Sequence, residues 1–171
     1  HRDLHSFPTR RSSDLHVQVP SARVVLHNHM PYTTALTLLQ DGRLEMCEQN
    51  ALQFVGRIAY DDEYNGLALD SNEGDRIAGK MGESSILFMA CHGVIVTGES
   101  VARAFTDLYY LERASMFQVL ARSTGGNLRQ ISDSVREATR GQMNKELPLI
   151  GERHFSALRR ILDREEPGYR S

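Results

Sequence analysis

Two short apolar segments, each ending in histidine, most constrain what this chain can fold into. The run 23–26 ends at His27 and His29, and the run 86–91 ends at His92. Short apolar runs of this kind, bounded by polar or turn residues, are typical of buried strands. Because side chains alternate between the two faces of a strand, we expect His27 and His29 to point to the same side.

A metal site is one interpretation of this pattern. His92, arriving from the end of a second strand, would add a third imidazole to His27 and His29. Three nitrogen ligands leave the fourth position of a tetrahedral zinc ion open, as catalytic zinc requires. The alternative is that these histidines are buried polar residues hydrogen-bonded to backbone groups.

Composition excludes several classes of function. The chain has 171 residues, the size of one domain with a buried core. Its net charge is -2 and its basic residues are scattered, whereas nucleic-acid binding needs concentrated positive charge. No apolar run approaches the roughly 20 residues of a membrane span. Two cysteines, Cys47 and Cys91, are too few for a disulfide framework, so we expect free thiols and a cytoplasmic location.

The first fifteen residues, HRDLHSFPTRRSSDL, differ from the rest of the chain. They show no hydrophobic period and are rich in arginine and serine. They are similar to a peptide translated from a sequencing adapter, which indicates a foreign segment; a natural disordered arm is the alternative. On the first interpretation the domain spans residues 16–171, and its true N-terminal part is missing.

The remaining chain predicts strands interleaved with helices, and therefore an α/β layered domain. We expect strands over residues 23–29, 67–69, 86–91 and 94–96. We expect helices over residues 33–39, 45–58, 71–80, 99–123, 132–146 and 152–164. Gly82 and Gly125 are placed to end helices, and Leu147-Pro148 is expected to separate the last two.

The residues around the histidines resemble two motifs of the class II aldolase/adducin family. The first motif is VVLHNHMPY at residues 24–32, which is similar to the metal-binding strand of that family. The second motif is CHGVIVTGESV at residues 91–101. Both occur in the order of the family and at about its spacing, and the resemblance covers the chain from His16 onward.

This resemblance implies a three-layer α/β/α fold with a central mixed sheet, often assembled as a homotetramer with active sites between subunits. It implies that His27, His29 and His92 bind Zn²⁺, or another divalent ion such as Mn²⁺, Co²⁺ or Fe²⁺. Many members make or break a carbon–carbon bond beside a carbonyl in a small hydroxylated molecule, using the metal to stabilise an enediolate. The resemblance therefore favours metal ligation over structural histidines.

The chain also departs from the enzyme pattern of this family. A phosphate-binding segment and a catalytic glutamate are expected upstream, the glutamate near residues 8–12, where only adapter-like sequence stands. Cys91 occupies a position that is usually asparagine. Residues 59–66 look more like the adducin-like branch, whose animal members serve in a membrane skeleton.

Three functions follow from these features. The first is a metal-dependent lyase acting on a small hydroxy-carbonyl, sugar-derived substrate, with little activity expected from this fragment. The second is a non-catalytic, adducin-like oligomerisation module. The third is an epimerase or decarboxylase that uses the same metal site.

Five further features carry weaker signals. Tyr169 in the C-terminal tail is a candidate proton donor, because a tail tyrosine of family aldolases reaches the active site of a neighbouring subunit. Cys91 is expected in the core rather than as a fourth ligand, because adjacent strand residues face opposite ways. We expect His16 to be structural, His154 to lie at the surface and Asp61-Asp62-Glu63 to form a solvated loop.

Tyr109, Tyr110 and Glu112 lie in the longest predicted helix. They could form a polar cluster, but tyrosine and leucine at helical spacing are more typical of core packing. We therefore expect core packing at these positions.

Overall fold

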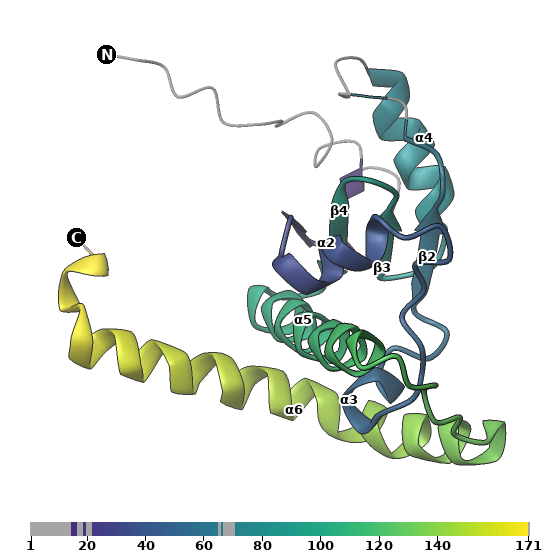
Figure 1. Cartoon of the computed structure of the whole chain (residues 1–171). Helices are drawn as coiled ribbons and strands as arrows, with labels where there is room; N and C mark the ends of the chain where they lie inside the picture. The colour runs from purple at the N-terminus through teal and green to yellow at the C-terminus, as the bar shows by residue number, and fades with distance from the viewer. Residues whose placement is uncertain (1–14, 17–18, 20–21, 65, 67–70, 171) are drawn as a thin grey trace.

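The computed structural model describes residues 15, 16, 19, 22–64, 66 and 71–170 (Figure 1). Four described strands form one mixed sheet in the order β1-β4-β3-β2. β4 pairs antiparallel with both β1 and β3, whereas β2 and β3 are parallel. The strands are β1 (Val24–Asn28), β2 (Ile58–Asp61), β3 (Ile86–Met89) and β4 (Gly93–Gly98).

Helices lie on both faces of this sheet, so the expected three-layer α/β/α arrangement is confirmed (Figure 1). α4 lies on one face, α5 on the other, and the long α6 lies outside α5. The helices are α2 (Pro31–Thr37), α3 (Gln49–Leu52), α4 (Ser71–Met81), α5 (Val101–Ser123) and α6 (Asp133–Glu165). A 3₁₀ turn, η1 (Pro167–Arg170), follows α6.

The side chains of β3 and β4 point alternately to the two faces of the sheet, so the core is divided into two clusters, one on each face. Phe88 and Val94 belong to the cluster that includes Leu111 of α5, whereas Leu87 and Ile95 belong to the cluster that includes Met81 of α4. Because successive strand residues point to opposite faces, apolar runs such as these can support helices on both sides. The central strands are therefore buried on both faces.

Some predicted elements match the structure closely. The strand expected over 23–29 is β1, and the helix expected over 99–123 is α5. Gly82 has φ +53° and Gly125 has φ +77°, both in the left-handed region that follows many helix ends. The strand expected over 67–69 lies outside the described residues.

The prediction of one helix over 45–58 is wrong. Only α3 is helical in this stretch, and β2 begins at Ile58, where the helix was expected to end. The Glu48 carboxylate accepts hydrogen bonds from the backbone N–H groups of Asn50 and Ala51 in α3, and Gly56 at φ +71° turns the chain toward β2. Phe54 between them is fully buried, so the apolar spacing reflects core packing without a continuous helix.

The prediction of two helices separated at Leu147-Pro148 is also wrong, because α6 is continuous across Pro148. Pro148 has no backbone N–H to donate to the carbonyl oxygen of Asn144, so one helical hydrogen bond is lost. Asn144 is exposed, and water can donate to that carbonyl instead. Leu147 and Gly151, one turn apart, are the buried residues of α6. A Cβ atom added at Gly151 would lie 3.6 Å from Arg103 Cα on α5, so α6 packs closely against α5 just beyond the proline.

None of the described helices is long and apolar enough to cross a membrane. α6 has the length for a span, but charged residues occur throughout it.

Candidate metal centre

The antiparallel pairing of β1 and β4 brings the three histidines together. His27 lies near the end of β1, paired with Ile95, and His29 directly follows that strand. His92 precedes β4 by one residue, in the turn that joins β3 to β4. The end of an antiparallel strand meets the start of its partner, so residues more than sixty positions apart become neighbours.

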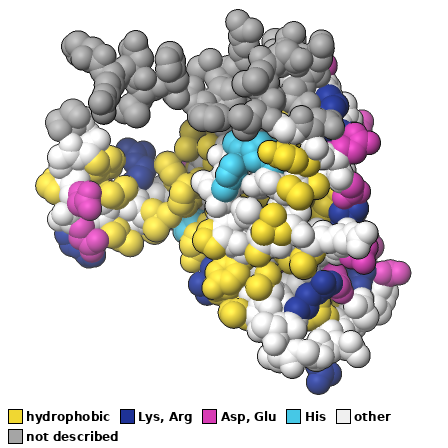
Figure 2. All heavy atoms as spheres, turned by 45° about the horizontal axis from the view of Figure 1, so that its top comes forward, with side chains coloured by type: hydrophobic (Ala, Val, Ile, Leu, Met, Phe, Trp, Pro, Cys, Tyr) yellow, Lys and Arg dark blue, Asp and Glu magenta, His cyan; other side chains and the backbone are white. Residues whose placement is uncertain are grey.

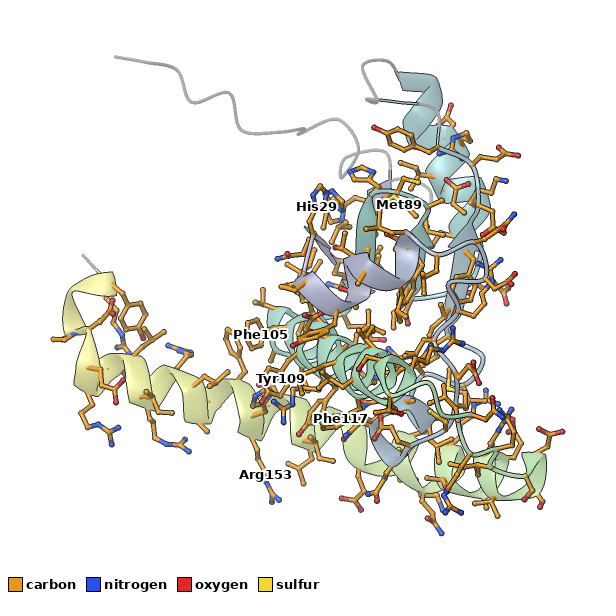
Figure 3. All side chains as sticks on the ribbon, in the orientation of Figure 1. His29, Met89, Phe105, Tyr109, Phe117 and Arg153 are labelled. Atoms are coloured by element: carbon orange, nitrogen blue, oxygen red, sulfur yellow. The ribbon has the colours of Figure 1, made fainter. Side chains whose placement is uncertain are left out.

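The three imidazole rings form a nearly symmetric group. Their centroids are 4.9 Å apart for His27 and His29, and 4.8 Å apart for each pair that includes His92. The three interplanar angles lie between 75° and 77°. Figure 2 shows histidine side chains, in cyan, at the surface of this face, and Figure 3 labels His29 above α2.

The spacing of the ring nitrogens fits a divalent ion. One nitrogen from each ring can be chosen so that all three lie within 4.8 Å of one another, and Nε2 of His27 and Nε2 of His29 are 3.1 Å apart. Tetrahedral zinc with Zn–N bonds of about 2.0–2.1 Å separates its ligand atoms by roughly 3.3 Å. The donor set, three imidazoles, is also one that catalytic zinc uses. The residues present therefore fit the metal that the sequence predicts.

A backbone contact fixes the tautomer of His27. Its Nδ1 lies 3.0 Å from the carbonyl oxygen of Val94. A carbonyl oxygen only accepts hydrogen bonds, so Nδ1 carries the proton and the neutral ring has its lone pair on Nε2. Nε2 is the atom that faces His29, and a donated Nδ1–H of this kind orients metal-binding histidines.

Gly93 is required by the close approach of β1. A Cβ atom at this position would lie 2.5 Å from the Asn28 carbonyl oxygen and 2.7 Å from Cδ2 of His29. Any side chain here would push β1 away or displace the His29 ring. The glycine after His92 thus contributes to the geometry of the centre without contacting a metal.

Glu112 of α5 holds the helix that follows the histidine pair. Its carboxylate accepts hydrogen bonds from the backbone N–H groups of Tyr32 and Thr33, each at 2.9 Å, and from Thr33 Oγ1 at 3.0 Å. Met30, the N-cap residue of α2, supplies no side-chain bond, so Glu112 replaces the usual cap and adds negative charge at the helix N-terminus.

Our expectation of core packing is therefore wrong at Glu112, and it is also wrong at Tyr109, which is exposed. The available signal was a helix that starts at Pro31 without a Ser, Thr, Asp or Asn cap before it. Sequence alone does not say which distant carboxylate supplies the missing acceptor.

Cys91 is exposed, so the expectation of a core cysteine is wrong. It lies in the turn before His92 with φ +55°, the only described non-glycine residue with positive φ. We placed Cys91 in the core because side chains alternate along a strand, but β3 ends at Met89, before the cysteine. Cys91 is not part of the three-histidine group. Both cysteines are free thiols, as expected.

Asp61 is buried, which contradicts the expectation of a solvated loop at this residue. It ends β2 with only 1% of its surface exposed and pairs with Arg76 of α4 at 2.6 Å. Asp62 and Glu63 are exposed, as expected. A bidentate hydrogen bond from Arg43 lowers the pKa of the Asp62 carboxyl below its usual value.

Tyr64 was missed by the sequence analysis. Its ring centroid lies 6.5 Å from that of His92, and about half of its surface is exposed. The structure thus places a phenol beside the histidine group. The surrounding residues read as an ordinary polar loop, so nothing in the local pattern marked this tyrosine.

Tyr169 is not brought to the histidines within this chain. It lies in η1, where its hydroxyl donates to Asp163 Oδ1 at 2.7 Å and accepts from Arg170 Nε at 3.1 Å. Figure 1 shows this end of α6 projecting away from the sheet.

The two other histidines among the described residues, His16 and His154, have structural contacts. His16 Nδ1 bonds to the carbonyl oxygen of Ala22, in line with the structural role expected. We expected His154 at the surface, and this prediction is wrong. The residue lies half-buried against α5. Its Nδ1 is 3.1 Å from Thr106 Oγ1 and its ring centroid is 4.9 Å from that of Tyr109, which Figure 3 shows between α5 and α6.

Comparison with known proteins identifies the family. The family described as Class II Aldolase and Adducin N-terminal domain matches residues 8–119, about two thirds of the chain, and the chain belongs to this family. A Caulobacter vibrioides protein named for class 2 aldolases is 31% identical over 158 residues, which cover 92% of this chain and 61% of that protein. The chain thus spans less than two thirds of that relative.

Two solved structures show the same fold. An aldolase II superfamily protein from Pseudomonas syringae matches with a TM-score of 0.85 and 32% identity, over 94% of this chain and 64% of that chain. An L-fuculose 1-phosphate aldolase from Glaciozyma antarctica matches with a TM-score of 0.75 and 20% identity, over 91% of this chain and 59% of that one. At this lower identity the second likeness shows the fold alone.

Proposed function

We propose that this chain forms the metal-binding part of a metal-dependent lyase that acts on small hydroxy-carbonyl compounds derived from sugars. The observation that carries the proposal is the near-symmetric group of His27, His29 and His92 in a class II aldolase fold. A relative named for class 2 aldolases supports the lyase, and the L-fuculose 1-phosphate aldolase that shares this fold makes sugar-derived compounds the first substrates to test.

The three histidines would hold the metal, with Zn²⁺ as the first candidate and Mn²⁺, Co²⁺ or Fe²⁺ as the others. A bound divalent ion supplies a Lewis acid that stabilises negative charge developing on substrate oxygens. The hydrogen bond from His27 Nδ1 to Val94 fixes one ligand ring and raises its basicity. His27 and His29 are exposed, so a small polar substrate can reach them from solvent.

We further propose that the chain assembles into a homo-oligomer in which Tyr169 serves the metal centre of another copy. Tyr169 is partly exposed on the projecting end of α6, where a second copy can meet it (Figure 1). A phenol has the acid strength and reach for proton donation. Tyr169→Phe, introduced at the matching position of a full-length relative, should reduce turnover without changing zinc affinity, and unchanged turnover would remove this role.

Zinc titration of the purified chain tests the metal claim. Isothermal titration at pH 7.5 should show one zinc ion per chain, and His92→Ala should weaken binding by at least 100-fold. His16→Gln removes an imidazole outside the group and serves as the matched control, with unchanged affinity expected. No zinc uptake by the unmodified chain, or equal affinity in the His92→Ala variant, would contradict the proposal.

Turnover separates the lyase from its alternatives. With a full-length relative as the enzyme, release of an aldehyde product from L-fuculose 1-phosphate and related ketose phosphates would support the lyase. Zinc binding with product of unchanged carbon skeleton, or with loss of carbon dioxide, would point to an epimerase or a decarboxylase. A folded, oligomeric chain that takes up no metal would point to an adducin-like assembly module.

A further inference from the structure

A cavity lies at the opposite end of the β1–β4 ladder from the histidines. It has a volume of about 580 Å³ and is bordered by Arg23 and Gly98. The histidine end of the ladder is marked by the pair Asn28 and Val94, and the cavity end by the pair Val24 and Gly98. The two pairs are four residue steps apart along the strands, a distance of about 14 Å at 3.4 Å per step. The two sites are therefore distinct.

Two guanidinium groups share one buried carboxylate at the floor of this cavity. Asp107 is fully buried and accepts hydrogen bonds from Arg57 and, at 2.9 Å, from Nε of Arg103. Arg57 also donates from Nε to Ser85 Oγ at 3.1 Å. One carboxylate neutralises only one of the two arginines, so the floor keeps a net positive charge, and the side chains of Arg57 and Arg103 are only partly exposed to solvent.

The N-terminus of α5 opens onto the same cavity and adds to this potential. Ser100, its N-cap residue, accepts a hydrogen bond from the backbone N–H of Arg103, and the first turn contains no acidic residue. Gly98 allows the helix to start this close to β4, because a Cβ atom there would lie 3.0 Å from the backbone nitrogen of Ala104. The dipole of this long helix favours negative charge at its start.

Charged side chains of both signs surround the mouth of the cavity. Arg23 is exposed and contributes positive charge, whereas Glu99 and Glu152 are exposed and contribute negative charge. Water and salt screen these exposed groups more strongly than the arginines at the floor. The interior therefore favours an anion, whereas the two glutamates disfavour ligands that carry a large negative charge.

We propose that this cavity binds a small molecule through an oxyanion group, a phosphate or a carboxylate, independently of the metal centre. The anion would lie among Arg23, Arg103 and the first turn of α5, where guanidinium forks and helix N–H groups can share it. Hydroxyl groups of Ser85 and Thr97 on the cavity wall are suited to further polar atoms of the ligand.

An NMR titration of the metal-free chain tests this proposal. Inorganic phosphate and malonate are added separately, and the backbone amide signals of residues 98–103 are followed. Both probes should shift these signals, and the tighter probe identifies the preferred oxyanion. His92→Ala should bind the probes equally well, which separates this site from the metal centre and from the proposed lyase activity.

Two variants make the test specific. Arg23→Gln removes an exposed charge from the mouth and should weaken binding at least fivefold, whereas Arg129→Gln, an exposed arginine beyond the other end of α5, should leave it unchanged. The double variant Glu99→Gln/Glu152→Gln should bind several-fold more tightly. Failure of both probes to shift these signals up to 20 mM ligand, or equal weakening by the two arginine variants, would overturn the proposal.

Discussion

The Nδ1 atom of His27 lies 3.0 Å from the carbonyl oxygen of Val94, although 67 positions separate the two residues in the chain. This bond joins the two family motifs, residues 24–32 and 91–101, across the β1–β4 ladder. The orientation of a ligand ring therefore depends on strand pairing, and changes that disturb the ladder at this end should also reduce metal affinity.

Gly93→Ala should destabilise the fold and weaken zinc binding together. The added methyl group would lie within 3 Å of Asn28 and His29, and overpacking of this kind costs about 1–3 kcal/mol. Chemical denaturation and zinc titration measure the two effects. Gly79→Ala in α4 is the matched control, because nothing lies within 4 Å of its Cβ position and alanine is the better helix former. Equal behaviour of the two variants would contradict the role assigned to Gly93.

Glu112→Ala should lower the free energy of unfolding by about 1–2 kcal/mol, because α2 loses the carboxylate that caps its first N–H groups. Zinc affinity should fall as well, since α2 directly follows the histidine pair. Glu146→Ala removes an exposed glutamate from α6 and should change neither quantity. A Glu112→Ala variant with unchanged stability would show that the cap contributes nothing.

The unfolding free energy should fall at alkaline pH because of Tyr60. Burial raises the pKa of its phenol above the usual value, and the phenolic oxygen accepts a hydrogen bond from the Leu44 N–H at 3.1 Å. The folded state thus resists ionisation. This contribution is complete below the unfolded pKa of about 10 and is lost as the pH rises through the higher folded value.

Denaturation curves measured between pH 8 and 11 check the Tyr60 effect. Tyr60→Phe should be less stable at pH 8, since Leu44 loses its acceptor, but its stability should decline less above pH 10. An equally steep decline in both proteins would assign the alkaline loss to other groups.

Cys91 should react with alkylating reagents well before Cys47. Cys91 is exposed, whereas burial and then the nearby Glu45 carboxylate raise the pKa of the half-buried Cys47 thiol. The thiolate is the reactive form, so a raised pKa slows Cys47 further. Mass spectrometry after timed iodoacetamide treatment distinguishes the two sites. Modification of Cys47 first, or of both at one rate, would contradict the structure.

The sequence predicted the parts of this fold that depend on local patterns. The apolar run of β1, the long α5 and the two histidine motifs all follow from short stretches of residues. The approach of His92 to His27 was predictable because both motifs place histidine at the end of an apolar run.

The errors lie where contacts between distant residues decide the structure. Packing of Leu147 and Gly151 against α5 keeps α6 continuous across a proline. Pairing with Arg76 takes Asp61 into the interior, and Glu112 caps α2 through Tyr32, 80 positions earlier in the chain. Neither the spacing nor the composition of the sequence identifies Arg76 as the partner of Asp61 or Glu112 as the cap of α2.

X-ray absorption at the zinc edge of the loaded chain tests the central claim most directly. Three imidazole nitrogens at about 2.0–2.1 Å, with an oxygen completing the shell, are the result expected of the His27, His29 and His92 group. The imidazole signal should drop by one ring in the His92→Ala variant. A shell with fewer than three imidazoles in the unmodified chain, or one with a sulfur ligand at about 2.3 Å from a cysteine, would contradict it.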